Sequence, residues 1–301
     1  GLVGSEMCIR DSIEAVGEAL SCPEAEEIDV SGKLLFPGFL DAHTHFDLEV
    51  CNTVTADDFY TGGRSALRGG TTTVIDFACP NKGETLHTGL ARWHEKADGK
   101  TGCDYGFHMT IDDWNDGIRA ELPQMFDEEG ISSFKMYMTY PAMMIGDEAM
   151  FHALREMKRL GGIVGVHCEN AGMIDALIAE KKDAGALSPS SHPLCRPAEA
   201  EAEAVGRLLK LARVADVPVM IVHLSTAAAL RGSRPRAASD RRSLWRPART
   251  TCCWTTHATA CRTLQAHAMS ARPRCARSST TSACGTVSYT HLRAHETDQY
   301  L

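Results

Sequence analysis

The sequence of 301 residues is long enough for one large domain or two smaller ones, and its formal net charge of -8 argues against a nucleic-acid or anionic-membrane partner. No apolar run approaches the roughly 18 residues that a membrane span requires, and no charged region followed by an apolar core marks a secretory signal. The twelve cysteines have no framework spacing, so we expect reduced thiols and a cytoplasmic location.

Strand-like apolar runs alternate with helical ones from Lys33 to about Leu230. The run "LLFPGFLDAH" leads into the first histidines, and Thr71–Pro80 ("TTTVIDFACP") has the composition of a buried strand. Helical spacing of apolar residues predicts a helix over Asp147–Leu160, with Asp147 as its N-cap and glycines after its end. A further helix is expected over Glu199–Arg213. This alternation predicts a parallel sheet and much of a (β/α)8 barrel.

Five side chains with metal-binding chemistry stand at the ends of the expected strands, where such barrels carry their catalytic groups. They are His43 and His45 after the first strand, Lys135 in "SFKMYMTY", His167 at the end of "IVGVH" and His223 at the end of "VPVMIVH". Alternate residues of a strand point the same way, so the two rings of His-x-His lie on one side of the chain. The pattern therefore favours a metal site.

Each of these residues also has a structural explanation. A lone histidine after an apolar run is more often a hydrogen-bonded core residue, and a single strand lysine is more often solvated at an edge. The metal site is favoured because several strands would otherwise end in a good ligand by accident. The remaining histidines of the regular region lack this placement and are expected to be structural or exposed: His87, His94, His108, His152 and His192.

Eight motifs stand in register over about 200 residues: "FPGFLDAHTHFD", "TVTADDF", "GGTTTVIDF", "DYGFHM", "SFKMYMTY", "VHCEN", "RPAEAEAEA" and "VHLST". In this order they resemble the cyclic-amidohydrolase branch of the amidohydrolase superfamily, and within it the dihydropyrimidinases and D-hydantoinases. The resemblance covers Ile13 to Leu230. It implies a (β/α)8 TIM-type barrel over residues 37–230, incomplete at its C-terminal end, and a remnant of a small β-sandwich domain over residues 13–36.

The resemblance also implies a centre of two divalent metal ions, usually zinc. His43 and His45 would bind the buried ion, and His167 and His223 the more exposed one. Lys135 would be N6-carboxylated, and this carbamate would bridge the two ions. A lysine must lose its proton to react with carbon dioxide, and burial beside cations favours that loss. A bridging hydroxide would then attack the ring carbonyl of a dihydropyrimidine or hydantoin.

Three further residues match substrate-contacting positions of the family. Tyr140 matches a tyrosine that hydrogen-bonds the developing oxyanion. Leu48 and Tyr137 match positions that shape the pocket for the ring substituent. The structural alternative for Tyr140 is a packed barrel aromatic.

The family also requires a general acid-base aspartate at the end of the last barrel strand. The candidates beyond Leu230 are Asp240 and Asp298, and neither follows a strand-like run. We therefore expect this aspartate to be absent from the chain.

The segment Arg231–Thr286 has eleven arginines and five cysteines but no lysine, glutamate, valine, isoleucine, phenylalanine or tyrosine. Such a composition cannot continue a barrel. Read one base out of register, the codons for Cys252 to Thr255 must give Leu-Leu-Asp, which resembles the family's continuation. We interpret the segment as an out-of-frame translation; the alternative is an arginine-rich arm.

The two ends of the sequence, residues 1–12 ("GLVGSEMCIRDS") and 287–301 ("VSYTHLRAHETDQYL"), resemble translated sequencing-adapter or linker sequence. We exclude both from the assignment of the fold.

The leading hypothesis is a metal-dependent hydrolase of small cyclic amides, represented by an incomplete chain whose intact parent is a homo-oligomer, as family members are commonly tetramers. Within this class, an allantoinase or a dihydroorotase-like cyclic amidase is the alternative. A non-catalytic family member is a second alternative, against which the five retained ligands argue. We expect the 301-residue chain itself to be inactive.

Overall fold

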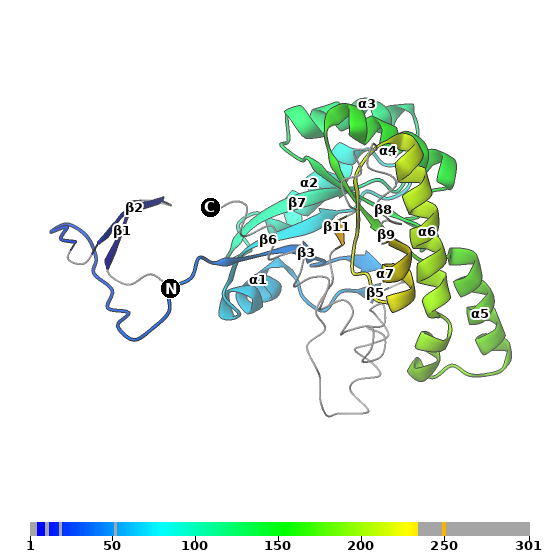
Figure 1. Cartoon of the computed structure of the whole chain (residues 1–301), viewed down its shortest axis with the longest axis horizontal. Helices are drawn as coiled ribbons and strands as arrows, with labels where there is room; N and C mark the ends of the chain where they lie inside the picture. Colours follow the sequence, from blue (N-terminus) through cyan, green and yellow to red (C-terminus); the bar gives the residue numbers. More distant parts are fainter. Residues whose placement is uncertain (1–4, 10–11, 18–19, 51–52, 234–248, 251–301) are drawn as a thin grey trace.

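The computed structural model describes residues 5–9, 12–17, 20–50, 53–233 and 249–250. Within them, one sheet has the strand order β11-β10-β9-β8-β7-β6-β3, and every neighbouring pair is parallel (Figure 1). Its strands are β3 (Phe39–Thr44), β6 (Thr71–Ala78), β7 (Asp104–Thr110), β8 (Ser133–Tyr137), β9 (Ile163–His167), β10 (Val219–Ile221) and β11 (Arg249–Thr250).

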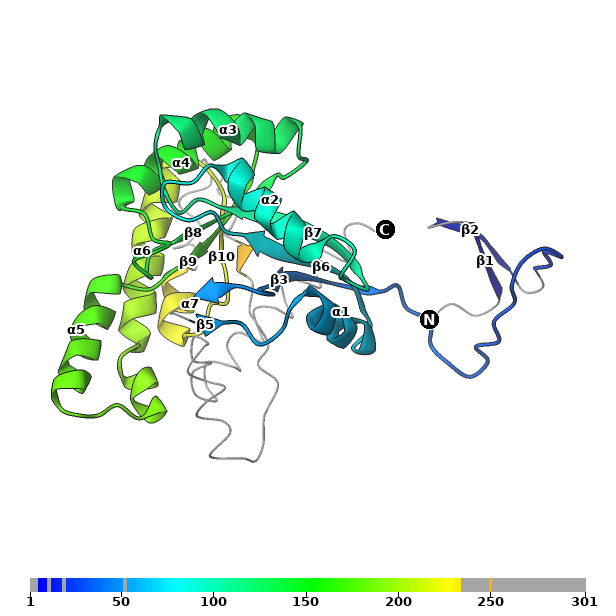
Figure 2. The ribbon, with the colours of Figure 1, turned by 180° about the vertical axis from the view of Figure 1, so that it is seen from behind.

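Helices follow the strands and pack beside one another around the sheet (Figures 1 and 2). They are α1 (Phe59–Arg68), α2 (Leu86–Ala97), α3 (Asp116–Asp127), α4 (Asp147–Leu160), α5 (Ala171–Asp183), the 3-10 helix η1 (Pro189–Leu194), α6 (Ala198–Ala215) and α7 (Ala227–Ser233). Strand–helix alternation around a parallel sheet confirms the expected (β/α) barrel, incomplete at its carboxyl end. None of the helices in the described residues is long and apolar enough to cross a membrane.

The helix expected over Asp147–Leu160 is confirmed with the same bounds. Its N-cap is Gly146 rather than Asp147, so that detail of the prediction was wrong. Asp147 instead lies in the first turn, where its carboxylate accepts a hydrogen bond from Arg207 at 2.5 Å. Gly161 ends the helix with φ +78°, a left-handed conformation that glycine adopts without strain.

The core lies between the sheet and its helices. Met109, Met136 and Val164 on the strands are fully buried against Leu154 and Leu208 on α4 and α6. The apolar runs that predicted strands β6, β8 and β9 therefore reflect real burial. The core fixes where each strand ends and so positions the side chains at the strand ends.

The N-terminal part carries a separate antiparallel hairpin of β1 (Ser5–Ile9) and β2 (Ser12–Gly17), which lies away from the main sheet in both views (Figures 1 and 2). The pairing crosses the boundary expected at residue 12 between the adapter-like and sandwich segments. Its geometry says nothing about the origin of these residues, so both assignments stay predictions.

The segment expected to be out of frame is described only at residues 231–233 and 249–250. The short strand β11 (Arg249–Thr250) pairs there with β10 in parallel. Asp240, Asp298 and the adapter-like residues 287–301 lie outside the described residues.

Strand β3 ends the described sheet and carries unusual apolar exposure. Phe39 and Leu40 in β3 are 61% and 58% exposed, and Leu34 and Phe36 just before it are 73% and 61% exposed. An apolar edge strand with free backbone groups is a template for pairing with another chain. We therefore expect the 301-residue chain to self-associate through β3.

Replacing Phe39 with Lys is expected to raise the concentration at which the chain self-associates by at least about tenfold, since a charge on an edge strand opposes pairing. Sedimentation velocity over a concentration series measures the shift. Leu187→Lys is the matched control, because Leu187 is 75% exposed but stands outside any strand. Equal shifts in both variants would show that β3 is not the associating surface.

Candidate metal centre

The four expected histidine ligands meet at the carboxyl ends of the strands. The ring centroids of His43 and His45 are 5.1 Å apart, those of His43 and His223 are 5.4 Å apart, and those of His167 and His223 are 4.6 Å apart. They come from β3, β9 and the residues just after β10, which are distant in sequence. The prediction that independent strands bring these imidazoles together therefore agrees with the geometry.

Lys135 is fully buried in β8, and its Nζ has no hydrogen-bond partner among the described residues. The amine lies 5.1 Å from the Phe77 ring centre and 5.0 Å from that of Tyr137. Burial lowers the pKa of Lys135 from 10.5 to about 7. The solvated edge lysine of the structural alternative is excluded, and a large share of the amine is neutral near pH 7.

His167 and His223 face each other through ring nitrogens: Nδ1 of His167 lies 3.0 Å from Nε2 of His223. On its other side, Nε2 of His167 lies 2.7 Å from a carboxylate oxygen of Glu169. Because a carboxylate accepts, Nε2 carries the proton and Nδ1 presents a lone pair. Burial lowers the pKa of both histidines well below the usual range, which keeps them in the neutral form that binds metals.

His43 and His45 share a wall formed by Phe77, whose ring centre lies 4.7 Å from each imidazole. Burial is the main cause that lowers the pKa of His45 to about 3, and it lowers the pKa of His43 further. Nδ1 of His45 is buried and has no partner among the described residues. A buried imidazole nitrogen without a partner is poised for an additional ligand.

Asp76 in β6 is a supporting residue that sequence reasoning missed. Its fully buried carboxylate accepts from Oγ1 of Thr44 and the backbone N–H of Phe46, both at 2.8 Å. It also accepts from the backbone N–H of Phe77 at 2.8 Å and from Nε1 of Trp93 at 3.0 Å. Burial raises its pKa to about 6, against the effect of these donors. Asp76 thereby fixes the turn on both sides of His45.

His108 was expected to be structural or exposed, and the structure gives it a supporting contact. Its Nε2 donates to the carbonyl of Ala42, beside His43, at 3.0 Å, and its Nδ1 lies 2.5 Å from Oγ of Ser133. The ring therefore ties β7 to β3 and β8. No pattern in "DYGFHM" distinguishes this role from that of an ordinary strand histidine.

Tyr137 and Tyr140 both lie beside His167. The Tyr140 ring centre is 5.0 Å from that of His167, and the Tyr137 ring centre is 5.9 Å from it. Tyr140 has φ +69°, which is left-handed and unusual for a bulky residue, as is common for residues with a function. Leu48 is buried in the apolar core and exchanges hydrogen bonds with Thr55. The substrate-contacting roles of all three stay predictions.

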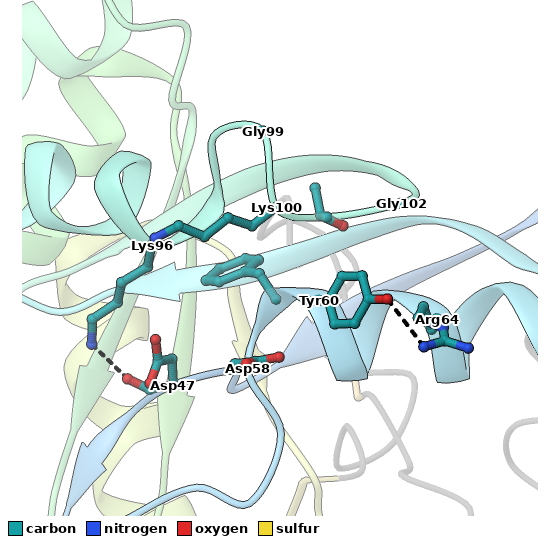
Figure 3. Close-up of a pocket in the computed structure, with 10 residues that line it drawn as sticks. Asp47, Asp58, Tyr60, Arg64, Lys96, Gly99, Lys100 and Gly102 are labelled. Atoms are coloured by element: carbon teal, nitrogen blue, oxygen red, sulfur yellow. Dashed lines mark hydrogen bonds between the residues drawn. The ribbon is translucent and has the colours of Figure 1, made fainter.

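A cavity of about 570 Å³ lies away from the histidines, beside the start of α1 and the end of α2 (Figure 3). Lys96 donates to the carbonyl of Asp47 at 2.5 Å on one side of it, and Arg64 donates to the hydroxyl of Tyr60 at 3.1 Å on the other. The cavity contains none of the five expected ligands. Its contacts instead hold the loop that follows His45.

Within the described part of the chain, no three His, Cys, Asp or Glu side chains form a group that could hold a metal ion alone. The family resemblance implies only two histidines for each ion, so a modified lysine and a further aspartate would be needed as well. The buried, unpartnered atoms Lys135 Nζ and His45 Nδ1 nevertheless fit cation ligands.

Residues 34–194 match the model of the amidohydrolase family. The chain belongs to this family. It is 42% identical over 228 residues to the D-hydantoinase of Geobacillus stearothermophilus, covering 75% of this chain and 48% of that protein. It is 37% identical over 203 residues to the dihydropyrimidinase of Rattus norvegicus, covering 67% of this chain and 39% of that protein.

The fold of this amidohydrolase agrees with solved relatives. The crystal structure of dihydropyrimidinase from Brevibacillus agri NCHU1002 matches with a TM-score of 0.71 and 42% identity, covering 77% of this chain and 49% of that one. The chain thus spans about half the length of the relatives it matches. The resemblance inferred from the eight sequence motifs is confirmed.

Proposed function

We propose that the intact protein from which this amidohydrolase chain derives hydrolyses a C–N bond in a cyclic amide, a dihydropyrimidine or hydantoin ring. The observation that carries the proposal is the meeting of the four histidines, together with the buried, unpartnered amine of Lys135 over Phe77, the ring that also packs against His43 and His45. The names of the similar proteins, D-hydantoinase and dihydropyrimidinase, support this class over the allantoinase or dihydroorotase alternative.

Two divalent cations, expected to be zinc, would complete the site. His43 and His45 would hold one, His167 and His223 the other, and N6-carboxylated Lys135 would bridge them. When bound, the cations would supply a water nucleophile near neutral pH and would polarise the ring carbonyl. The chain's own part is to present neutral imidazoles, of which His167 is buried and the other three are half-buried.

Lys135 would acquire its carboxyl group by direct reaction with carbon dioxide. The neutral nitrogen's lone pair forms the N–C bond, one C=O electron pair moves onto oxygen, and the nitrogen loses one proton to water. The lowered pKa supplies the neutral amine that this reaction needs. The rings of Phe77 and Tyr137 line the buried amine, and burial rather than these rings favours its neutral form.

Tyr140 would donate its hydroxyl proton to the oxygen that becomes negative during ring opening. We expect Tyr140→Phe to lower kcat by about 10²–10³-fold with a smaller change in KM, because the donor acts mainly in the transition state. Steady-state kinetics measures kcat and KM on the frame-corrected protein, which is the chain translated in the reading frame expected beyond Leu230. Tyr60→Phe is the control, since Tyr60 is 53% exposed and contacts Arg64. Equal losses of kcat in both variants would exclude Tyr140 as the donor to the developing oxyanion.

We propose that the substrate is a small molecule and that the intact protein is a cytoplasmic homotetramer. These proposals rest on the family resemblance and on the acidic charge of -8. Size-exclusion chromatography with light scattering on the frame-corrected protein tests the tetramer.

The absent general acid-base aspartate is proposed to be encoded in the correct reading frame beyond Leu230. Resequencing the source DNA across the codons for Ser225 to Thr290 tests this, with dihydrouracil and hydantoin assays on both proteins. We expect one inserted or deleted base, an active corrected protein and an inactive 301-residue chain. Hydrolysis by the 301-residue chain at a normal enzyme rate would contradict the proposal.

A further inference from the structure

The "RPAEAEAEA" stretch has no part in the chemistry proposed above, yet it contacts the residues that follow both β9 and β10, beside His167 and His223. It comprises Arg196 and Pro197 and the first turns of α6, which runs beside α5 and α7 (Figure 1). We propose that Arg196–Glu203 is a positioning segment that sets the spacing and orientation of His167 and His223. What these histidines hold rests on the proposed function; their positioning does not.

The first connection links Arg196 to His167 through the carboxylate of Glu169. Nη1 of Arg196 donates to Oε2 of Glu169, the same oxygen that lies 2.7 Å from Nε2 of His167. The Arg196 and Glu169 side chains are only 12% and 9% exposed, so water screens this pair little. The guanidinium also lies 5.3 Å from the Tyr140 ring centre. Arg196 therefore holds the carboxylate that orients the His167 ring.

The second contact runs from Glu201 to the turn that carries His223. Oε1 of Glu201 accepts from the backbone N–H of Ser225 at 2.7 Å, and the Ser225 hydroxyl donates to the carbonyl of His223 at 2.7 Å. His223 has φ +37°, which a non-glycine residue keeps only when its surroundings impose it. Glu201 is 8% exposed and supplies that constraint from the first turn of α6.

The sheet fixes His167, which pairs with Tyr137 of β8, but it does not fix His223. The paired residues of β9 and β10 end at Val166 and Ile221, so His223 stands two residues beyond the ladder. The positioning segment adds direct ties to the β9 loop: the N–H of Asn170 donates to the carbonyl of Ala200 at 3.0 Å, and Nδ2 of Asn170 donates to Glu203 at 2.6 Å. One segment thus binds the residues after both strands.

The test uses the 301-residue chain and two pairs of variants. Arg196→Met and Glu201→Ala remove the contacts, while Arg196→Lys and Glu201→Gln keep a donor or an acceptor. Glu199→Gln is the control, because Glu199 is exposed in the same stretch. Calorimetric titration with Zn²⁺ alone and the visible absorption of added Co²⁺ measure affinity and ligand geometry. We expect Arg196→Met and Glu201→Ala to weaken Zn²⁺ binding by about 10–100-fold. Arg196→Lys and Glu201→Gln should recover part of the lost affinity.

A metal-free measurement separates this inference from the proposed function. The ¹⁵N shifts of the two rings report the tautomer of His167 and the environment of His223. We expect an Nε2–H tautomer for His167 in the parent chain, changed ring shifts in the Met and Ala variants, and none in Glu199→Gln. If these shifts change, the positioning role stands whether or not the 301-residue chain binds Zn²⁺. The proposed metal centre fails separately, if the frame-corrected protein binds no Zn²⁺. Unchanged ring shifts in the Met and Ala variants, with only a lower Tm, would overturn the positioning role.

Discussion

Replacing Lys135 with Met is expected to stabilise the metal-free chain and to weaken the proposed binding of cations. The amine is fully buried without a hydrogen-bond partner, so an apolar side chain of similar length fits the same walls without a desolvated charge. We expect a gain of about 1–4 kcal/mol in the free energy of unfolding at pH 7. Urea denaturation in the presence of a chelator measures the gain, and Zn²⁺ titration measures the loss of binding.

The gain in the free energy of unfolding depends on pH, and the pKa of Lys135 sets the sign of this dependence. The pKa of Lys135 is about 7 in the folded chain and 10.5 in the unfolded reference, so the unfolded chain binds more protons between these values. The stability of the parent chain therefore rises with pH across this window, and that of the Met variant lacks this contribution. The difference in stability between the Met variant and its parent is therefore largest below pH 7, and this contribution vanishes as the pH approaches 10.5. A Met variant that is less stable than its parent at pH 7 would contradict a destabilising effect of the buried, unpartnered amine.

Replacing Asp76 with Ala is expected to destabilise the chain by about 3–5 kcal/mol, since four donors lose one buried acceptor. The turn that carries His45 depends on two of these donors, Thr44 and the N–H of Phe46. Zn²⁺ affinity should therefore fall together with the stability. Urea denaturation and Zn²⁺ titration measure the two effects.

Asp57→Ala is the control for Asp76→Ala, because Asp57 is exposed and contributes only its backbone carbonyl, to Asp47. Asp76→Asn should lose less stability, since its amide oxygen still accepts from Phe77 and Trp93. A loss below about 1 kcal/mol in Asp76→Ala would show that these hydrogen bonds contribute little.

The sequence predicts those features that depend on local periodicity. Apolar runs located β6, β8 and β9, and helical spacing located α4 with its ending glycine. The barrel architecture predicts functional side chains at the ends of the strands. In the structure the histidines lie at neighbouring positions there. The helix predicted over Glu199–Arg213 extends slightly further, over Ala198–Ala215.

The supporting residues could not be predicted, because their partners are distant in the sequence. Trp93 stands 17 residues from Asp76, and Arg196 stands 27 residues from Glu169. A buried aspartate within "TTTVIDF" has no sequence signal that separates it from a strand residue facing solvent. The left-handed backbone at Tyr140 and His223 is likewise imposed by tertiary contacts rather than by residue type.

The central claim is that the five strand-end ligands build one centre of two cations around a carboxylated lysine. A crystal structure of the frame-corrected protein, grown with Zn²⁺ and bicarbonate and measured at the zinc absorption edge, tests it most directly. The account predicts two anomalous peaks, one at His43 and His45 and one at His167 and His223, with a carboxyl group on Nζ of Lys135 between them. Zinc bound elsewhere, or a free amine at Lys135 with no zinc beside the four histidines, would contradict it.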